Sequence, residues 1–283
     1  MSTRHPTAVL KFGGEVVADT PALVQAMRQV RQLVDEGWRF VLCHGGNPQA
    51  NALSTRLGLQ RRQIAGRRIT DAETLRVMKQ VLAGECNIDV LAAAIAQGLQ
   101  AVGISGVSAG LVTAQRRPPK VMSGCGPDPI DFGYVGDILE IRTALIELLW
   151  DHGYTPVLNT LGVSREPDGV SGVCEVYNIN ADTVAAAVAS ALRVDHLFLM
   201  TGVPGVLRDR DDPSTRIPRL TEHQARQAIA DGTIVAGMIP KVEEALQNLS
   251  QGIGAVHIIG AAEGSIAEEA HRPGSVGTVL LAD

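Results

Sequence analysis

Several familiar site signatures are missing from this sequence of 283 residues. Its four cysteines are widely spaced and form no C-x-x-C pair, so we expect neither a disulfide framework nor a zinc site. Its seven histidines form no H-E-x-x-H arrangement, and we name no metal ligand in the chain. The P-loop pattern G-x-x-x-x-G-K-S/T, the dinucleotide pattern G-x-G-x-x-G and the protein-kinase signatures are also absent, which argues against those three classes.

Strongly charged stretches and long apolar runs are missing too. The net charge is −5 and no basic run occurs, so we expect no nucleic acid or membrane partner, and an anionic substrate must be held by a few local cations. The N-terminus lacks the apolar stretch of a signal peptide, and the Ala/Val-rich segment Val184–Leu192 is too short to span a bilayer. We therefore expect a soluble cytoplasmic protein, whose 45% hydrophobic content is ample for a large core.

The chain contains instead a regular alternation of short apolar runs and helical patterns. We predict strands at Ala8–Phe12, Phe40–Cys43, Ala101–Ile104, Thr155–Leu158, His196–Met200, Ala255–Ile259 and Thr278–Leu281. We predict helices at Pro21–Val34, Asn51–Leu57, Ile88–Gln97, Ala144–Leu149 and Asp182–Leu192, and others opened by Pro240, by a capping box of Thr221 with Gln224, and by a capping box of Thr70 with Glu73. Strands that are apolar on both faces predict an α/β fold, with a mainly parallel central sheet sandwiched by helices. A soft boundary near Tyr177 divides the chain into two lobes, residues 1–177 and 178–283.

The middle of the chain departs from this alternation. Leu111–Ala114 and Phe132–Val135 have the pattern of short strands around a loop rich in proline and glycine, so we predict a surface β-hairpin. Just before it, Gly106–Gly110 fits the G-x-S-x-G motif of serine hydrolases, which requires a strand before the serine and a helix after it. Since a strand is predicted to follow, we interpret Ser108 as a loop serine and not as a nucleophile.

Two glycine-rich turns stand at strand ends in the first part of the chain, where ligands bind in open α/β sheets. Lys11–Gly14 places a lysine and two glycines after a strand, which suits a phosphate, although a surface lysine before a turn has the same pattern. His44–Asn47 leads into a helix whose N–H groups can receive an anion, and we interpret His44 itself as structural.

Two further turns stand at helix starts in the last part of the chain. The segment Tyr177–Asp182 places two amides and one carboxylate close together at a helix start. Asn180 is suitable as the N-cap of that helix, but capping explains only one of these three polar groups. Gly237–Val242 puts Lys241 in the first turn of a helix, where a cation opposes the helix dipole. A lysine at that position indicates an anion to bind, with a solvated side chain as the alternative.

Together and in this order, the four turns resemble the amino-acid kinase superfamily, and specifically the N-acetylglutamate kinases. The stretches GRRITDAETLRVMKQVLAG, IDFGYVGDI and LFLMTGVPGVL agree with this resemblance, which runs from about Val9 to Thr278. The sequence departs from the family at Asn47, which replaces the third glycine of H-G-G-G, and at Gly202, which replaces the aspartate of T-D-V. It also departs at the turn SGVSAG and in the segment AEGSIAEEAHRPGSVGT.

The resemblance implies roles for individual residues. Lys11 and Lys241 match the two lysines that stabilise the transferred phosphoryl group, and Asp182 matches the carboxylate that holds both lysines in place. The implied substrate-binding residues are Gly45, Gly46, Asn47, Arg68, Asn178 and Asn180, of which Arg68 and Asn178 hold the substrate's α-carboxylate. The implied nucleotide-binding residues are Gly13, Gly14, Thr201, Gly202, Val203, Gly205, Val206 and Leu207. The first lobe is then the substrate-binding and dimerisation lobe, and the second is the nucleotide-binding lobe.

The implied reaction is the ATP-dependent phosphorylation of the side-chain carboxylate of N-acetyl-L-glutamate to an acyl phosphate, in arginine biosynthesis. Such a carboxylate has a pKa of about 4.3, so it needs no general base but only positioning and charge neutralisation. Mg²⁺ would be held mainly by the nucleotide's phosphates and by water. Two alternatives remain open: a sister kinase for another N-blocked acidic amino acid, such as a carrier-linked aminoadipate, and a degenerate kinase fold that only binds nucleotide or a partner protein.

Two further expectations concern assembly and substrate fit. Only seven residues precede the strand at Ala8, which leaves no room for the extra N-terminal helix of hexameric, feedback-inhibited members of the family. We therefore expect a homodimer, with the helix from Asp71 to about Leu82 near its interface. Asn47 either caps the helix that follows it or contributes to substrate recognition. In the second case, its side chain narrows the pocket or forms a hydrogen bond with an acyl group other than acetyl.

Overall fold

A central β-sheet organises the computed structural model, which describes residues 5–60, 62–64, 67–122, 127–209, 212–234, 238–262 and 264–283. Within these residues the sheet has eight strands in the order β12-β14-β13-β11-β1-β2-β8-β5. Their bounds are β1 Thr7–Phe12, β2 Arg39–His44, β5 Ala101–Ser105, β8 Thr155–Asn159, β11 His196–Met200, β12 Arg219–Thr221, β13 Ala255–Ile259 and β14 Thr278–Leu281. All neighbours run parallel except β13 and β14, which pair antiparallel, so the prediction of a mainly parallel sheet is confirmed.

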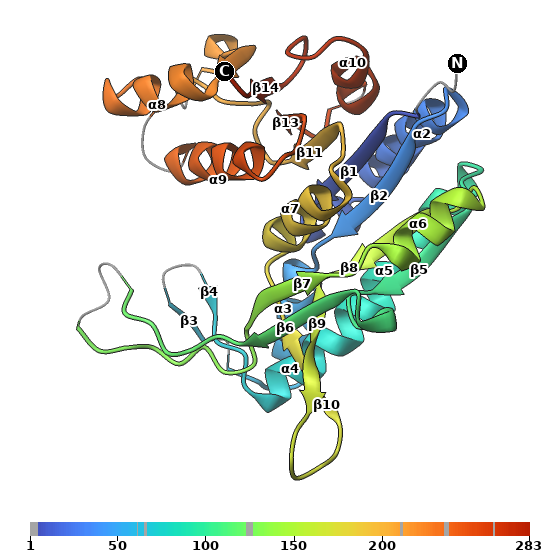
Figure 1. Ribbon diagram of the computed structural model, residues 1–283, viewed down its shortest axis with the longest axis vertical. Helices are drawn as coiled ribbons and strands as arrows, with labels where there is room; N and C mark the ends of the chain where they lie inside the picture. Colours follow the sequence, from blue (N-terminus) through green and yellow to red (C-terminus); the bar gives the residue numbers. More distant parts are fainter. Residues whose placement is uncertain are drawn as a thin grey trace.

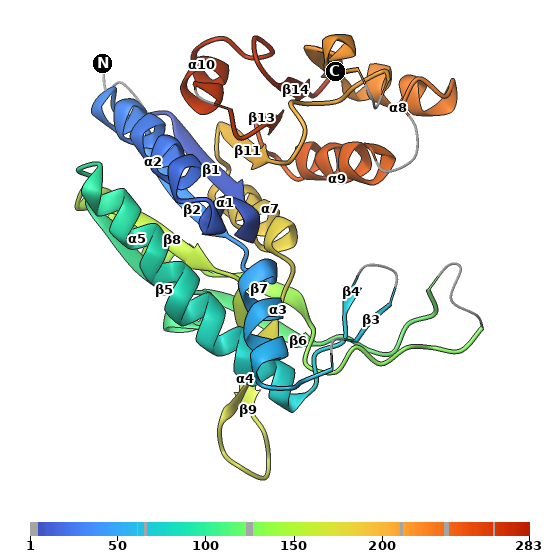
Figure 2. The ribbon, with the colours of Figure 1, turned by 180° about the vertical axis from the view of Figure 1, so that it is seen from behind.

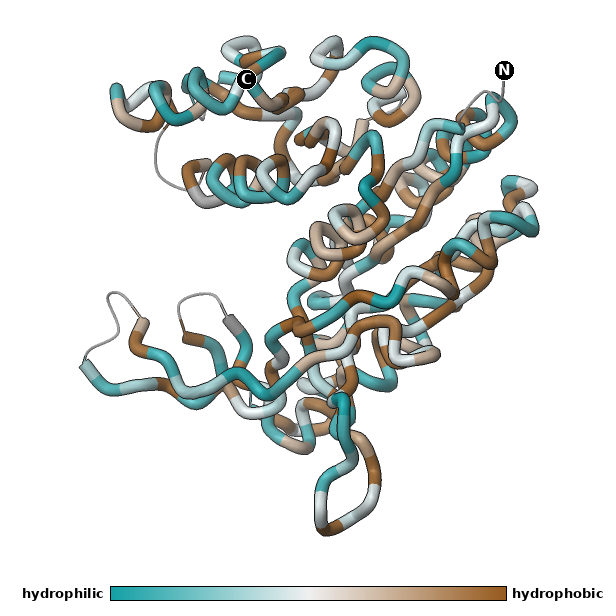
Figure 3. Tube along the Cα trace, in the orientation of Figure 1, coloured by the Kyte–Doolittle hydropathy of each residue, from teal (hydrophilic) through white to brown (hydrophobic). Residues whose placement is uncertain are grey.

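Helices cover both faces of this sheet, as the apolar strands required. Alternate residues of β1 enter different core clusters, with Leu10 and Phe12 in one and Val9 in the other. The helices that contribute to the cluster of Phe12 include α2 (Thr20–Asp35), α5 (Asn87–Ala96) and α10 (Ser265–His271). The helices packed with Val9 are α6 (Ala144–Asp151), α7 (Ala181–Leu192), α8 (Glu222–Ala230) and α9 (Ile239–Ser250). Figures 1 and 2 show the two helical layers from opposite sides, and Figure 3 shows that the strands between them are mostly hydrophobic.

The sheet is continuous across the boundary that the sequence suggested at Tyr177. β1 from the first part of the chain pairs in parallel with β11 from the last part, with Val9 opposite Leu197. In Figure 1 the elements that follow β11 gather at the top, while residues 101–122 and 127–178 lie lower. The division into a substrate lobe and a nucleotide lobe therefore stays a prediction about roles, carried on one shared sheet.

A second, smaller sheet of four strands lies beside the main one, in the order β10-β9-β6-β7. Its strands are β6 (Val112–Arg116), β7 (Gly136–Ile141), β9 (Leu161–Pro167) and β10 (Cys174–Asn178). β6 and β7 pair antiparallel, as the predicted hairpin requires. The second strand, however, begins at Gly136 and not at Phe132. Gly133 has a φ of +70°, which breaks the extended conformation, and the segment around it makes backbone hydrogen bonds with Thr70 instead.

The helix after Thr70 also begins differently from the prediction. The N-cap of α4 (Ala72–Gln80) is Asp71, whose carboxylate accepts a hydrogen bond of 2.8 Å from the backbone N–H of Thr74. This bond lowers the pKa of Asp71. Thr70 is fully buried and is not the cap, and its hydroxyl instead accepts a bond from the Asn178 side chain. α4 continues through a π-helical turn, Val81–Cys86, into α5.

The remaining helices and turns complete the frame. The capping box that opens α8 is present as predicted, with Thr221 and Gln224 bonded reciprocally. Ser108 lies in a 3₁₀ turn that leads into strand β6, so the helix that a nucleophile elbow requires does not follow it. Short elements that were not predicted include α1 (Gly14–Ala18), the hairpin β3–β4 (Gln63–Ile64 and Arg67–Arg68), β12 and α10. Among the described helices, none has the length and apolar character needed to traverse a bilayer.

Candidate active site

Three of the four predicted turns meet at the carboxyl ends of the central strands. A Cβ atom on Gly14 would lie only 2.8 Å from the Cα of Gly46, so the turn after β1 and the turn after β2 pack directly against each other. A Cβ on Gly45 would lie 3.8 Å from the Cβ of Ala181, the first residue of α7. Helix starts therefore converge here, and their free N–H groups form a suitable environment for an anion.

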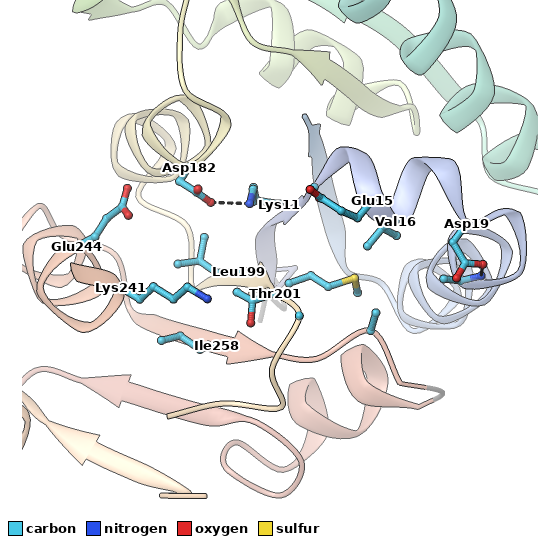
Figure 4. Close-up of a pocket in the computed structure, with 15 residues that line it drawn as sticks. Lys11, Glu15, Val16, Asp19, Asp182, Leu199, Thr201, Lys241, Glu244 and Ile258 are labelled. Atoms are coloured by element: carbon cyan, nitrogen blue, oxygen red, sulfur yellow. Dashed lines mark hydrogen bonds and ion pairs between the residues drawn. The ribbon is translucent and has the colours of Figure 1, made fainter. Parts of the chain in front are cut away.

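A cavity of about 550 Å³ lies against these turns. Figure 4 shows the side chains that point into it from β1, α7, α9 and the end of β11. The predicted residues in its wall are Lys11, Gly13, Asp182, Thr201, Gly202 and Lys241. The first, third and fourth motifs thus share one cavity, and the second packs against the first beside it, although Gly237, which begins the fourth motif, lies outside the described residues.

An ion pair lies at the N-terminal end of α7. The Nζ atom of Lys11 lies 2.7 Å from Oδ1 of Asp182, and the two side chains are 13% and 34% exposed. Asp182 stands in the first turn of α7, where the helix dipole favours a carboxylate. Lys241 extends from the first turn of α9 into the same cavity, toward Thr201 (Figure 4). Within the described part of the chain, Asp182 forms an ion pair with Lys11, but no ion pair joins Asp182 to Lys241.

The predicted nucleotide loop is only partly exposed to the cavity. Thr201 and Gly202 line it, while Val206 and Leu207 are buried in the core. The N–H of Val206 donates a bond of 2.8 Å to the Thr278 hydroxyl, which ties the far half of the loop to β14. The cavity wall does not include Val203, Gly205, Val206 or Leu207, nor Gly14, which packs against the turn at Gly46.

Sequence reasoning missed the apolar part of the wall. Leu199 and Met200 end β11, and Ile258 lies on the neighbouring strand β13. Their position at the carboxyl end of buried parallel strands was the signal that could have identified them. Other wall residues that were not predicted are Glu15, Val16, Asp19, Ala22, Glu244 and Ala261.

The predicted substrate residues gather beside the cavity and not in its wall. Nη2 of Arg68, on β4, donates to Oδ1 of Asn51 at 2.6 Å and to Oδ1 of Asn47 at 3.4 Å. Nδ2 of Asn178 donates to the Thr70 hydroxyl at 3.2 Å. Asn180 caps α7 as predicted, since its Oδ1 accepts a bond of 2.7 Å from the N–H of Asp182.

Asn47 is not a helix cap. The N-cap of α3 (Asn47–Arg56) is Gly46, no side chain caps this helix, and Asn47 is the first helical residue. Its amide contacts Arg68 instead, so the capping interpretation is wrong. The helix starts four residues earlier than the predicted Asn51 because Pro48 suits the first turn.

His44 has the structural role that the sequence suggested. Its side chain is fully buried, Nδ1 bonds to the Gly45 carbonyl at 3.0 Å, and Nε2 bonds to the amide of Asn87 at 3.1 Å. Burial lowers the pKa of His44 to about 4, so the ring is neutral at pH 7. A neutral imidazole with Nδ1 protonated accepts from Asn87 and donates to Gly45, which fixes the turn that contains Gly45 and Gly46.

Comparison with known proteins agrees with this geometry. The chain belongs to the amino acid kinase family, whose model matches residues 6–260. Among curated relatives it is 48% identical to an acetylglutamate kinase of Sorangium cellulosum over 282 residues, which are 99% of this chain and 96% of that protein. It is 47% identical to an acetylglutamate kinase of an Anaeromyxobacter species over 276 residues, 97% and 99% of the two chains. The solved structure of smu.665 from Streptococcus mutans superposes with a TM-score of 0.71 at 27% identity and covers 98% of this chain and 99% of that chain. The resemblance to N-acetylglutamate kinases is thereby confirmed.

Proposed function

We propose that this chain transfers the γ-phosphoryl group of ATP to the side-chain carboxylate of N-acetyl-L-glutamate, in the cytoplasm and as a step of arginine biosynthesis. The observation that carries this proposal is the Lys11–Asp182 ion pair in the wall of a cavity that also receives Lys241. Its site is a junction of helix starts, where phosphates are bound readily. The full-length similarity to acetylglutamate kinases supports the choice of acceptor.

The reaction needs no proton transfer. An oxygen of the ionised acceptor carboxylate attacks the γ-phosphorus, the bond from that phosphorus to the bridging oxygen of ADP breaks, and the products are an acyl phosphate and ADP. Lys11 and Lys241 neutralise negative charge on the transferred group from two sides. Asp182 keeps the ammonium of Lys11 in position, so less reorganisation is needed when charge develops.

The two substrates would enter from opposite ends of the site. Arg68 and Asn178 would hold the α-carboxylate of the acceptor, with the backbone of Gly45 and Gly46 close to its reacting end. Thr201 and Gly202, with the apolar residues at the ends of β11 and β13, would receive the nucleoside part of ATP. Val203, Gly205, Val206 and Leu207 would contribute by fixing the course of that loop.

A Mg²⁺ ion fits this site only as a companion of the nucleotide. The described residues contain no group of three or more histidine, cysteine, aspartate or glutamate side chains that could hold a metal ion. Mg²⁺ keeps much of its water and prefers phosphate oxygens, so the nucleotide itself would supply most of its ligands. The ion would neutralise phosphate charge that the two lysines do not reach.

Hydroxamate trapping of the acyl phosphate tests the proposal directly. The purified chain is incubated with ATP, Mg²⁺ and one member of a panel of N-acylated and free acidic amino acids, and ADP release is measured in parallel. We expect the highest kcat/KM with N-acetyl-L-glutamate. A higher value with an N-blocked aminoadipate would establish the sister activity instead, and nucleotide binding without any acyl phosphate would establish a degenerate kinase.

We also propose that the chain forms a homodimer that uses the continuous helix of α4 and α5. Ile88 and Ile95 of α5 are 59% and 60% exposed and stand two helical turns apart, on one side of that helix. A second copy of the chain would remove this apolar surface from water. Light scattering of the purified protein checks the proposal, and a hexamer, or strong inhibition by arginine, would contradict it.

A further inference from the structure

Arg68 does not stand alone at the acceptor end of the site. Its strand β4 is two residues long and pairs only with β3 within the described part of the chain, and such a short hairpin is not stable by itself. Nη2 of Arg68 bonds to the side-chain oxygen of Asn51 at 2.6 Å, which is the short end of the range for a charged donor. The half-buried Asn51 therefore ties the guanidinium to α3, a regular helix of ten residues.

A second amide supports the same nitrogen from one turn earlier in the helix. Asn47 and Asn51 are four residues apart, so their side chains lie on the same side of α3. The Asn47 oxygen is 3.4 Å from Nη2, so this bond is the weaker of the two. Both residues accept through neutral amide oxygens, which restrain the planar guanidinium without cancelling its charge.

We infer that Asn51 is a positioning residue for the acidic substrate, because it orients Arg68 through a neutral oxygen and adds no negative charge of its own. The inference rests on the proposed function, in which Arg68 holds the α-carboxylate. A planar guanidinium grips a carboxylate through two parallel bonds only when its plane is correctly set. A carboxylate at position 51 would set the plane equally well, but it would compete with the substrate for the same charge.

Two variants of the full-length chain separate these effects by steady-state kinetics with N-acetyl-L-glutamate and ATP. Asn51→Ala removes the acceptor, and Asn51→Asp keeps the size and the hydrogen bond but adds a negative charge. We expect both to raise KM for the acidic substrate by about tenfold, with KM for ATP and kcat changed by less than about twofold. Asn51→Ala does so by removing one bond to a charged group, and Asn51→Asp by adding a carboxylate that competes with the substrate for the guanidinium. A merely structural role predicts wild-type KM in Asn51→Asp.

The matched control is Thr55→Ala, which removes an exposed hydroxyl from the same helix, where it bonds only to the Asn51 carbonyl among the contacts of its side chain. It should leave both KM values unchanged. Should Asn51→Ala fail to fold, Asn51→Asp still decides the matter. A wild-type KM for the acidic substrate in Asn51→Asp, or in a folded Asn51→Ala, overturns the inference alone. Absence of turnover by the unmodified chain with every acceptor in the panel overturns the proposed function, and the inference falls with it.

Discussion

The two ends of the proposed site are held in place by different forces. At the phosphoryl end, opposite charges are in contact, with Lys11 and Asp182 2.7 Å apart, and Lys241 adds a second cation to the same cavity. At the acceptor end, Arg68 is oriented by amide oxygens, and the neighbouring turn is fixed by His44, whose pKa is lowered to about 4 by burial so that it stays neutral. The phosphoryl end thus brings opposite charges together, while the acceptor end holds Arg68 through the neutral amide oxygens of Asn51 and Asn47.

This difference follows from what each end must do. Charge moves along the transferred phosphoryl group, so fixed cations there stabilise the transition state more than the ground state. The acceptor's α-carboxylate keeps its charge throughout the reaction and contributes binding and orientation. We therefore expect variants at the phosphoryl end to change kcat and variants at the acceptor end to change KM.

The largest effect is expected from removing the lysines. Lys11→Ala and Lys241→Ala should each lower kcat by about 10²–10³, by analogy with deleting one donor to a developing charge. Lys11→Ala should also lower the melting temperature more than Lys241→Ala, because it leaves Asp182 without its cation. Kinetic assays measure the rate, and thermal unfolding measures the melting temperature. Lys120→Ala, at an exposed position, is the control. A kcat near the wild-type value in Lys241→Ala would remove that residue from the site.

A lower pH should reduce the stability of the fold because His44, at the acceptor end, is held neutral by burial. Its pKa is about 4 in the folded chain and about 6.5 when unfolded, so below pH 6.5 the unfolded state binds the proton more readily. The free energy of unfolding should therefore fall as the pH drops from 6.5 toward 4, by roughly 3 kcal/mol for a shift of this size. Urea unfolding at pH 7 and pH 4 measures the loss. His44→Gln, which has no titrating ring, should reduce the pH dependence without abolishing it, because burial also lowers the pKa of His196 to about 4. An unchanged slope in that variant would exclude His44 as a cause.

Arg68→Lys tests whether the acceptor end acts through binding. A lysine keeps the positive charge but loses the planar fork, so KM for the acidic substrate should rise by about fivefold to tenfold while KM for ATP and kcat change little. Arg226→Lys, an exposed position on α8, is the matched control. A loss of kcat equal to that of the lysine variants would show that the two ends are not functionally distinct.

The sequence predicted the phosphoryl end better than the acceptor end. Lys11, Asp182 and Lys241 each stand within two residues of a strand end or a helix start, and such positions can be found from local patterns. Their convergence in one cavity was an expectation from the resemblance, because no local pattern carries the distance between them. Asn51 was missed because its partner is 17 residues away, on a hairpin too short to be recognised.

The fold, too, was predicted well in one part and poorly in another. All seven strands predicted from apolar runs lie in the central sheet, where burial on both faces produces a clear signal. β9 and β10 were missed because only part of each strand is buried, and β9 ends in the exposed residues Arg165, Glu166 and Pro167. The cap at Thr70 was assigned wrongly because T-x-x-E fits the capping pattern, while the long-range bond from Asn178, 108 residues away, determines where Thr70 points.

The smallest effect, and the sharpest test of the acceptor end, is expected from Asn47→Gly. The variant removes an exposed side chain whose bond to Arg68 is long, at 3.4 Å, and opens the space beside Gly46. Since Asn47 is not the cap of α3, the melting temperature should fall only slightly, as for a glycine in a first helical turn. We expect the ratio of kcat/KM for N-acetyl-L-glutamate to that for larger N-acyl glutamates to shift by about twofold to fivefold toward the larger acyl groups, which is the scale of a small change in pocket size. An unchanged ratio would mean that Asn47 does not contribute to recognition of the substrate's acyl group.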